Sequence, residues 1–148
     1  MRRKFIALFF ILLLSSPFMA GCVKKEKDNS NENNTSTITW YTYQEGVSKA
    51  KSSGKPVLVD FYADRCDPCR MMDAYTYTNS KVIDEVNSNF VAVKVDVDTE
   101  QSIAYFYNIR LIPTVVYLDS QGNEVYRTIG YRDANQFIQD MNIALQRI

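Results

Sequence analysis

Residues 57–69 read Val-Leu-Val-Asp-Phe-Tyr-Ala-Asp-Arg-Cys-Asp-Pro-Cys. The first seven form a nearly continuous apolar run, which is typical of a strand covered on both faces of a sheet. Cys66 and Cys69 follow within one helical turn of each other, and Pro68 suits the first turn of a helix, where its missing N–H costs nothing. Because two thiols at this spacing can join and separate reversibly, the stretch indicates redox chemistry.

Composition narrows the classes of function. The 148 residues include 17 basic and 17 acidic side chains, so nothing indicates a polyanionic partner such as nucleic acid. The chain has no histidine, which excludes Ser/His and Cys/His catalysis and histidine metal sites. It has three cysteines, one pair and one left over, so the four ligands of a structural zinc site are missing and no metal is expected.

The first 21 residues have the pattern of an export signal. Basic residues 2–4 precede an apolar run at 5–14, which makes ~15 Å of helix, about half a hydrocarbon core. Residues 19–22, Met-Ala-Gly-Cys, then resemble the lipobox of bacterial lipoproteins. That resemblance implies cleavage after residue 21 and lipidation of Cys22, which would anchor the chain to the envelope membrane outside the cytoplasm. A plain signal peptide with a stray cysteine, or an uncleaved anchor, is the alternative.

Residues 22–37 are predicted to be a flexible tether, because they offer too little apolar surface to offset chain entropy. A folded domain is expected at 38–148. Periodicity and turn residues predict helices at 43–50, 66–75, 80–86, 99–107 and 133–145, and strands at 57–63, 90–97, 114–118 and 124–129. Strands and helices alternate in the first half of the domain, which implies parallel strands, and the final hairpin adds antiparallel ones. The expected fold class is therefore α/β, with a central mixed sheet flanked by helices.

Three motifs in this order carry a family resemblance. Residues 59–69 contain the Cys-x-x-Cys segment, residues 94–96 read Lys-Val-Asp, and residues 112–114 read Ile-Pro-Thr. Together they resemble the active-site segment, the segment after the third helix and the cis-proline loop of the thioredoxin-like family, over about residues 40–145. The lead-in at 54–56 is most similar to exported thioredoxin-like proteins and to the C-terminal domain of the disulfide reductase DsbD.

The resemblance implies roles for five residues. Cys66, at a helix start that favours the thiolate, would attack a substrate disulfide, and Cys69 would then release the reduced substrate. Asp60, whose pKa burial should raise, would exchange a proton with the buried thiol; otherwise it is an acid at a strand end that reaches water. Pro113 would follow a cis bond, leaving the backbone of Ile112 free to pair with an extended substrate.

Other residues near the motif leave alternatives open. Lys94 is either the partner of Asp60 or a surface lysine on an alternating strand. Arg65 stands where the family usually has tryptophan, so part of the flat substrate platform is missing. The tyrosines at 75, 77, 105, 107 and 131 fit either a docking surface or ordinary core and rim packing.

The sequence therefore predicts a membrane-tethered thiol–disulfide oxidoreductase outside the cytoplasm, acting as a reductase through a Cys66–Cys69 disulfide without another cofactor. The expected partners are a disulfide-containing exported protein, as substrate, and a membrane thiol carrier, as electron donor. Two alternatives are a disulfide oxidase or isomerase, and a lipoprotein binding module without turnover.

Overall fold

The computed structural model describes residues 36–148. The predicted signal peptide, Cys22 and the tether up to residue 35 lie outside the described residues. Within residues 36–148, no helix has the length and apolar character needed to cross a membrane.

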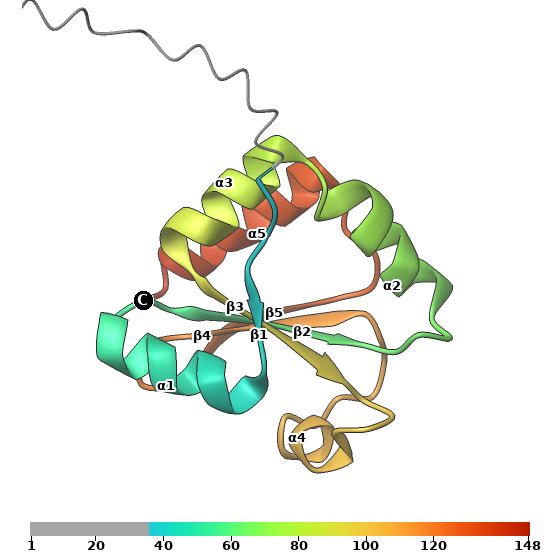
Figure 1. Cartoon of the computed structure of the whole chain (residues 1–148), viewed down its shortest axis with the longest axis horizontal. Helices are drawn as coiled ribbons and strands as arrows, with labels where there is room; N and C mark the ends of the chain where they lie inside the picture. Colours follow the sequence, from blue (N-terminus) through green and yellow to red (C-terminus); the bar gives the residue numbers. More distant parts are fainter. Residues whose placement is uncertain (1–35) are drawn as a thin grey trace, which may run out of the picture. The chain divides into compact units, whose positions relative to one another are not determined.

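A mixed five-stranded sheet forms the centre of the domain (Figure 1). Its strands are β1 (Trp40–Tyr41), β2 (Val57–Tyr62), β3 (Val91–Asp96), β4 (Thr114–Leu118) and β5 (Glu124–Ile129). They lie in the order β1-β3-β2-β4-β5, with β1 and β2 parallel to β3, and β4 antiparallel to β2 and β5. The predicted mixed sheet is confirmed, whereas β1 was not predicted because two residues are too few to show alternation.

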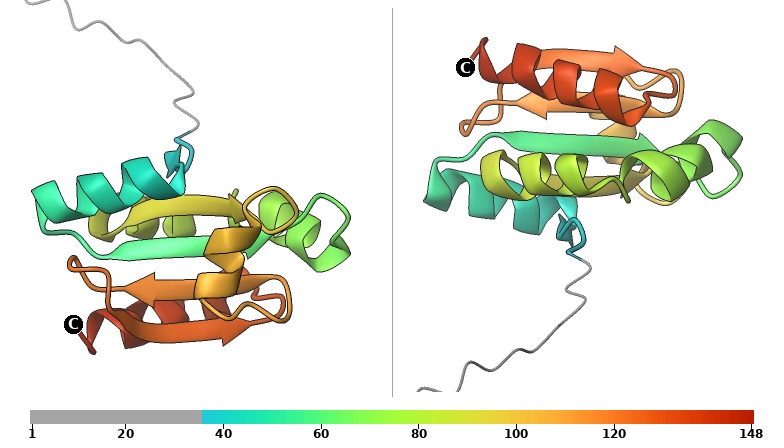
Figure 2. Two further views of the ribbon diagram at one scale, coloured as in Figure 1. Left: turned by 90° about the horizontal axis from the view of Figure 1, so that it is seen from below. Right: turned by 90° about the horizontal axis from the view of Figure 1, so that it is seen from above.

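Helices cover both faces of the sheet. They are α1 (Tyr43–Ser53), α2 (Asp67–Met71), α3 (Ser80–Asn89), α4 (Gln101–Phe106) and α5 (Ala134–Leu145). The opposite views of Figure 2 show α1 and α4 on one face and α3 and α5 on the other. A short π-helical turn, η1 (Met72–Thr76), follows α2 directly, so the single helix predicted at 66–75 is divided into two segments.

Local sequence explains where the helices begin and end. The side chain of Asn79 accepts hydrogen bonds from the backbone N–H groups of Lys81 and Val82 in the first turn of α3, and Asp133 caps α5 by accepting one from Gln136. Gly54 ends α1 in a left-handed conformation with φ 72°, which glycine adopts without a steric penalty.

Side chains alternate in direction along β2, and this alternation decides which of them pack against each layer of helices. Val59 and Phe61 pack in the core under α1 and α4, whereas Leu58 packs in the core under α3 and α5. Asp60 shares the face of Leu58, because side chains two residues apart point the same way. Lys94 of β3 lies directly opposite Asp60 in the parallel register, so the two side chains are neighbours on that face.

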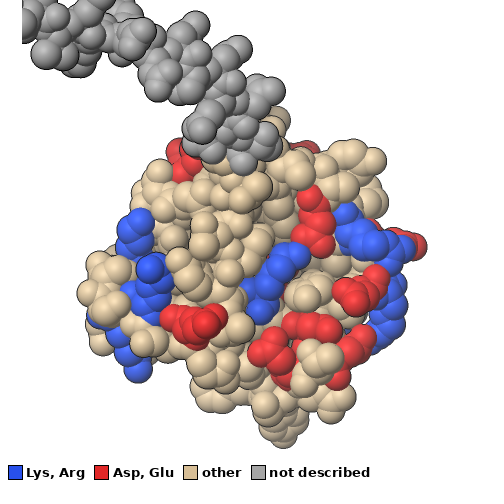
Figure 3. Space-filling model, in the orientation of Figure 1, with Lys and Arg blue, Asp and Glu red and all other residues tan. Residues whose placement is uncertain are grey.

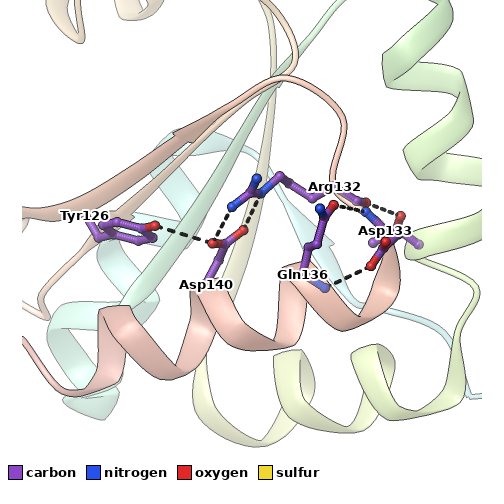
Figure 4. A network of polar contacts seen from close by, with 6 residues as sticks. Tyr126, Arg132, Asp133, Gln136 and Asp140 are labelled. Carbon is purple, nitrogen blue, oxygen red and sulfur yellow. Dashed lines mark hydrogen bonds and ion pairs between the residues drawn. The ribbon is translucent and has the colours of Figure 1, made fainter.

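A partly buried ion pair connects α5 to the loop that precedes it (Figure 4). Asp140 of α5 accepts two hydrogen bonds from the guanidinium of Arg132, at 2.6 and 2.8 Å, and one from the Tyr126 hydroxyl at 3.4 Å. The carbonyl of Arg132 accepts a further bond, of 2.6 Å, from the hydroxyl of Thr76 in η1. These contacts connect α5 with the turn that follows α2.

Candidate active site

Cys66 and Cys69 form a disulfide at the start of α2, with their Cα atoms 5.2 Å apart. Cys66 is the residue that caps α2, and its sulfur accepts a hydrogen bond of 3.2 Å from the backbone N–H of Cys69. Cys66 is 8% exposed and Cys69 is 3% exposed. Both cysteines are therefore buried, and Cys66 is slightly the more exposed of the two.

The loop before β4 packs against the disulfide. The peptide bond between Ile112 and Pro113 is cis, as the resemblance implies, and the side chain of Ile112 contacts the cluster of Ala63, Cys66 and Cys69. Within residues 36–148, neither the N–H nor the carbonyl of Ile112 forms a backbone hydrogen bond. These two groups are available to an extended chain that approaches the disulfide.

Asp60 is buried beside Lys94, at 2% exposure, so the alternative in which it reaches water is wrong. Burial raises its pKa from 3.8 to about 7, against the opposing effect of Lys94, whose Nζ lies 3.8 Å from Oδ2 of Asp60. A carboxyl with that pKa gains and loses a proton near neutral pH. Lys94 is therefore the partner of Asp60 rather than an unpaired surface lysine.

Four further side chains around Lys94 were not assigned to the site by sequence reasoning. Asp73 of η1 forms a second ion pair with Lys94, and its charge adds to the rise in the pKa of Asp60. The rings of Tyr62, Trp40 and Tyr77 face the ammonium, with centroids 4.6, 5.3 and 5.5 Å away. Of these residues, only Asp73 could have been assigned from the sequence, because it follows Cys69 by four residues and would therefore lie on the same side of a helix.

The two arginines nearest to the disulfide are both paired with acids. Arg65 binds both carboxylate oxygens of Asp98, at 2.7 and 3.1 Å, and Arg70 pairs with Asp67 and with the carbonyl of Asp64. Figure 3 shows basic and acidic side chains side by side over the region of α2. Local charges therefore largely cancel around Cys66.

The five tyrosines singled out in the sequence do not form one surface. Tyr77 and Tyr107 are buried in the two cores, whereas Tyr75 and Tyr105 are exposed and Tyr131 is half-buried. Within residues 36–148, no cluster of three or more acidic or cysteine side chains could hold a metal ion.

The sequence model of the thioredoxin-like domain matches residues 43–144. The chain belongs to the thioredoxin-like family. Its fold and its paired cysteines are those of a thiol–disulfide oxidoreductase. Among solved structures, a thioredoxin from Thermus thermophilus is 29% identical, with a TM-score of 0.66 over 72% of this chain and 85% of that one. A DsbH oxidoreductase, 18% identical, shares the fold with a TM-score of 0.69 over 82% of this chain and 94% of that one.

Two curated proteins are similar in sequence to this thioredoxin-like chain. The thiol:disulfide interchange protein DsbD of Yersinia pestis is 35% identical over 98 residues, which cover 62% of this chain but 16% of that protein. A thioredoxin-like protein of Synechocystis is 40% identical over 95 residues, which cover 62% of this chain and 83% of that protein. This chain thus spans about a sixth of the length of the DsbD relative.

Proposed function

We propose that this thioredoxin-like chain is an extracytoplasmic, membrane-tethered thiol–disulfide reductase. The observation that carries the proposal is the Cys66–Cys69 disulfide at the start of α2, with the loop of Ile112 and Pro113 packed against it. Asp60, buried on the face of the sheet that α3 and α5 cover, has a pKa suited to proton exchange at neutral pH.

The first step is attack by the reduced protein on a substrate disulfide. The thiolate of Cys66 forms a bond to one substrate sulfur, and the other substrate sulfur leaves and takes up a proton. The N–H of Cys69, which donates to the sulfur of Cys66, would favour the thiolate because hydrogen bonds to a charged acceptor are stronger than neutral ones. The free backbone groups of Ile112 would hold the substrate chain in extended form.

The second step releases the substrate. Asp60 accepts the proton of the Cys69 thiol, whose sulfur then attacks Cys66. The Cys66–Cys69 bond forms and the mixed disulfide breaks, and the released substrate sulfur takes up a proton as Asp60 gives up the one it accepted. Two electrons and two protons have then passed to the substrate, which leaves as a dithiol. A membrane thiol carrier, itself oxidised to a disulfide, would return the two electrons and reopen the cysteine pair.

The reducing direction is supported by the charges around Cys66. A strong oxidant needs a reduced form that is unusually stable, which a well-stabilised thiolate provides. Here Arg65 and Arg70 are each engaged by a carboxylate, and an acid, Asp67, directly follows Cys66 in the chain. These contacts favour a reductase over a disulfide oxidase or isomerase.

Reduction of insulin by dithiothreitol tests the activity. The wild-type chain should accelerate the reaction, Cys66→Ser should abolish the acceleration, and Cys22→Ser should retain it. An inert wild type would instead favour the binding module. Equilibration with glutathione should give a reduction potential below about −240 mV, and a value well above that range would reverse the direction.

The tether is the second half of the proposal. Residues 1–21 would be a lipoprotein signal peptide, Cys22 the lipidated first residue of the mature chain, and residues 22–37 a flexible connection to the domain at 38–148. The pairing of Cys66 with Cys69 leaves Cys22 as the third cysteine, and the lipobox-like sequence supports its modification. Labelled palmitate should enter the wild-type chain but not Cys22→Ser, which should also leave the membrane fraction. Equal labelling of both chains would contradict lipidation at this residue.

A further inference from the structure

Two buried polar atoms beside Lys94 have no hydrogen-bond partner among residues 36–148: Oδ1 of Asp60 and the hydroxyl of Tyr77. Buried polar groups are nearly always paired, so two unpaired ones in the same place point to an interaction between them. Tyr77 is the residue directly after η1, and its backbone N–H closes that turn on the carbonyl of Met72.

The surroundings hold both groups against the same ammonium. Oδ2 of Asp60 lies 3.8 Å from Nζ of Lys94, and the centroid of the Tyr77 ring lies 5.5 Å from it. Edge contacts with Trp40 and Phe137, at centroid distances of 5.0 and 5.4 Å, fix the orientation of the ring. The Tyr77 hydroxyl is close enough to lower the pKa of Asp60. Burial, and then the charge of Asp60, raise the pKa of Tyr77 well above its usual value, so the hydroxyl keeps its proton.

We propose that Tyr77 is a positioning residue for the redox reaction, whose hydroxyl donates to Oδ1 of Asp60 while Lys94 holds Oδ2. This inference rests on the proposed function, because it assumes that Asp60 exchanges a proton with Cys69. A phenol suits that task because it can donate to the carboxylate and can also accept from the protonated carboxyl. The bond to the charged form is the stronger, so the hydroxyl favours ionisation of Asp60.

The other ionisable groups that influence Asp60 come from different elements. Lys94 on β3 opposes its protonation, and Asp73 on η1 favours it. Tyr62 on β2 and Tyr117 on β4 lie within range of its charge. Of these, Tyr117 provides a matched control for Tyr77, since it is also a buried tyrosine whose hydroxyl has no hydrogen-bond partner in the part of the chain that the structure describes. Its strongest charged neighbour is Asp140 rather than Asp60.

The test compares Tyr77→Phe with Tyr117→Phe in the purified full chain. Both variants keep the ring and remove a buried hydroxyl, so both should fold. A carbon-13 NMR titration of the Asp60 carboxyl in the oxidised protein should give a midpoint near 7 for the wild type. Tyr77→Phe should raise that midpoint by about one pH unit, because a hydrogen bond to the charged form is lost. Tyr117→Phe should leave the midpoint within a few tenths of a unit. Equal midpoints for the two variants would overturn the proposal.

A second readout links the contact to the reaction. The pH–rate profile for insulin reduction should move to higher pH in Tyr77→Phe by the same interval as the NMR midpoint, and should not move in Tyr117→Phe. A shifted midpoint with an unchanged rate profile would overturn the positioning role. An inert wild type would refute the proposed function instead, and the NMR titration would then decide the Tyr77–Asp60 contact on its own.

Discussion

Replacing Asp60 with asparagine should stabilise the folded protein strongly at alkaline pH and much less at acid pH. The carboxyl is buried, and its pKa is about 7 in the folded state against 3.8 when exposed. Between these values the folded protein holds a proton that the unfolded chain has released. Stability therefore falls as the pH rises through this interval, and the full loss is present above about pH 7. Asparagine carries no charge at any pH and avoids that loss.

The magnitude follows from the interval between the two pKa values. A difference of about three units, at about 1.36 kcal/mol each, corresponds to about 4 kcal/mol at alkaline pH. At pH 4.5 the unfolded carboxyl is already mostly ionised, so about 1 kcal/mol of the loss has appeared there. The difference between Asp60→Asn and wild type should therefore grow by about 3 kcal/mol between pH 4.5 and pH 8. Any pH-independent cost of packing an amide at this position cancels in that comparison.

Urea unfolding of the oxidised chain, in the absence of reductant, measures how the stability difference between Asp60→Asn and wild type changes with pH. Wild type and Asp60→Asn would be unfolded at pH 4.5 and pH 8, with Asp84→Asn as a control, because Asp84 is exposed on α3. The control should show no pH-dependent difference from wild type beyond a few tenths of a kcal/mol. A difference between Asp60→Asn and wild type that is the same at both pH values would refute a raised pKa at Asp60.

Three further predictions concern packing and the cysteine pair. A Cβ on Gly46 would lie 2.1 Å from a methyl group of Val93, so Gly46→Ala should lower the free energy of unfolding, measured by thermal unfolding, by about 1–3 kcal/mol. The double variant with Val93→Ala should lose less stability than the sum of the two single variants, because the smaller side chain makes room for the new methyl group. Asp140→Ala should lower the free energy of unfolding by about 2 kcal/mol, because it leaves the partly buried guanidinium of Arg132 without its carboxylate. Insulin reduction by this variant, measured below its melting temperature, should stay near the wild-type rate. Cys69→Ser should accumulate a mixed disulfide with substrate on a non-reducing gel, and normal turnover by that variant would contradict its role in release.

Much of the fold was predictable because its signals are local. The apolar run of β2, the cap at Asn79 and the cap at Asp133 each act within one turn or strand, and the structure places these elements within a few residues of the predicted bounds. The division of the active-site helix into α2 and η1 was not predictable, since a π-helical turn leaves no change in hydrophobic period over five residues.

The site was predictable only in part. The two cysteines and the Ile112–Pro113 bond are recognised by motif, and the structure packs Ile112 against the disulfide. The role of Asp73 was not recognised, because it depends on contact with a lysine of β3 that lies 21 residues away. The ion pair between Arg65 and Asp98 spans 33 residues and was likewise outside the reach of any local pattern.

Sequence alone determined the order of the longer helices and strands and the spacing of the dithiol, since these depend on residue type and spacing along a few neighbouring positions. The cis bond before Pro113 was expected only from the resemblance to the thioredoxin-like family. Tertiary structure alone decided which side chains surround the buried carboxyl. Trp40, Tyr77 and Asp73 reach Lys94 from three different segments only because the parallel register places Lys94 opposite Asp60 and the helices then cover that face. Register is a property of strand pairing across the sheet, so no single stretch of the chain records it.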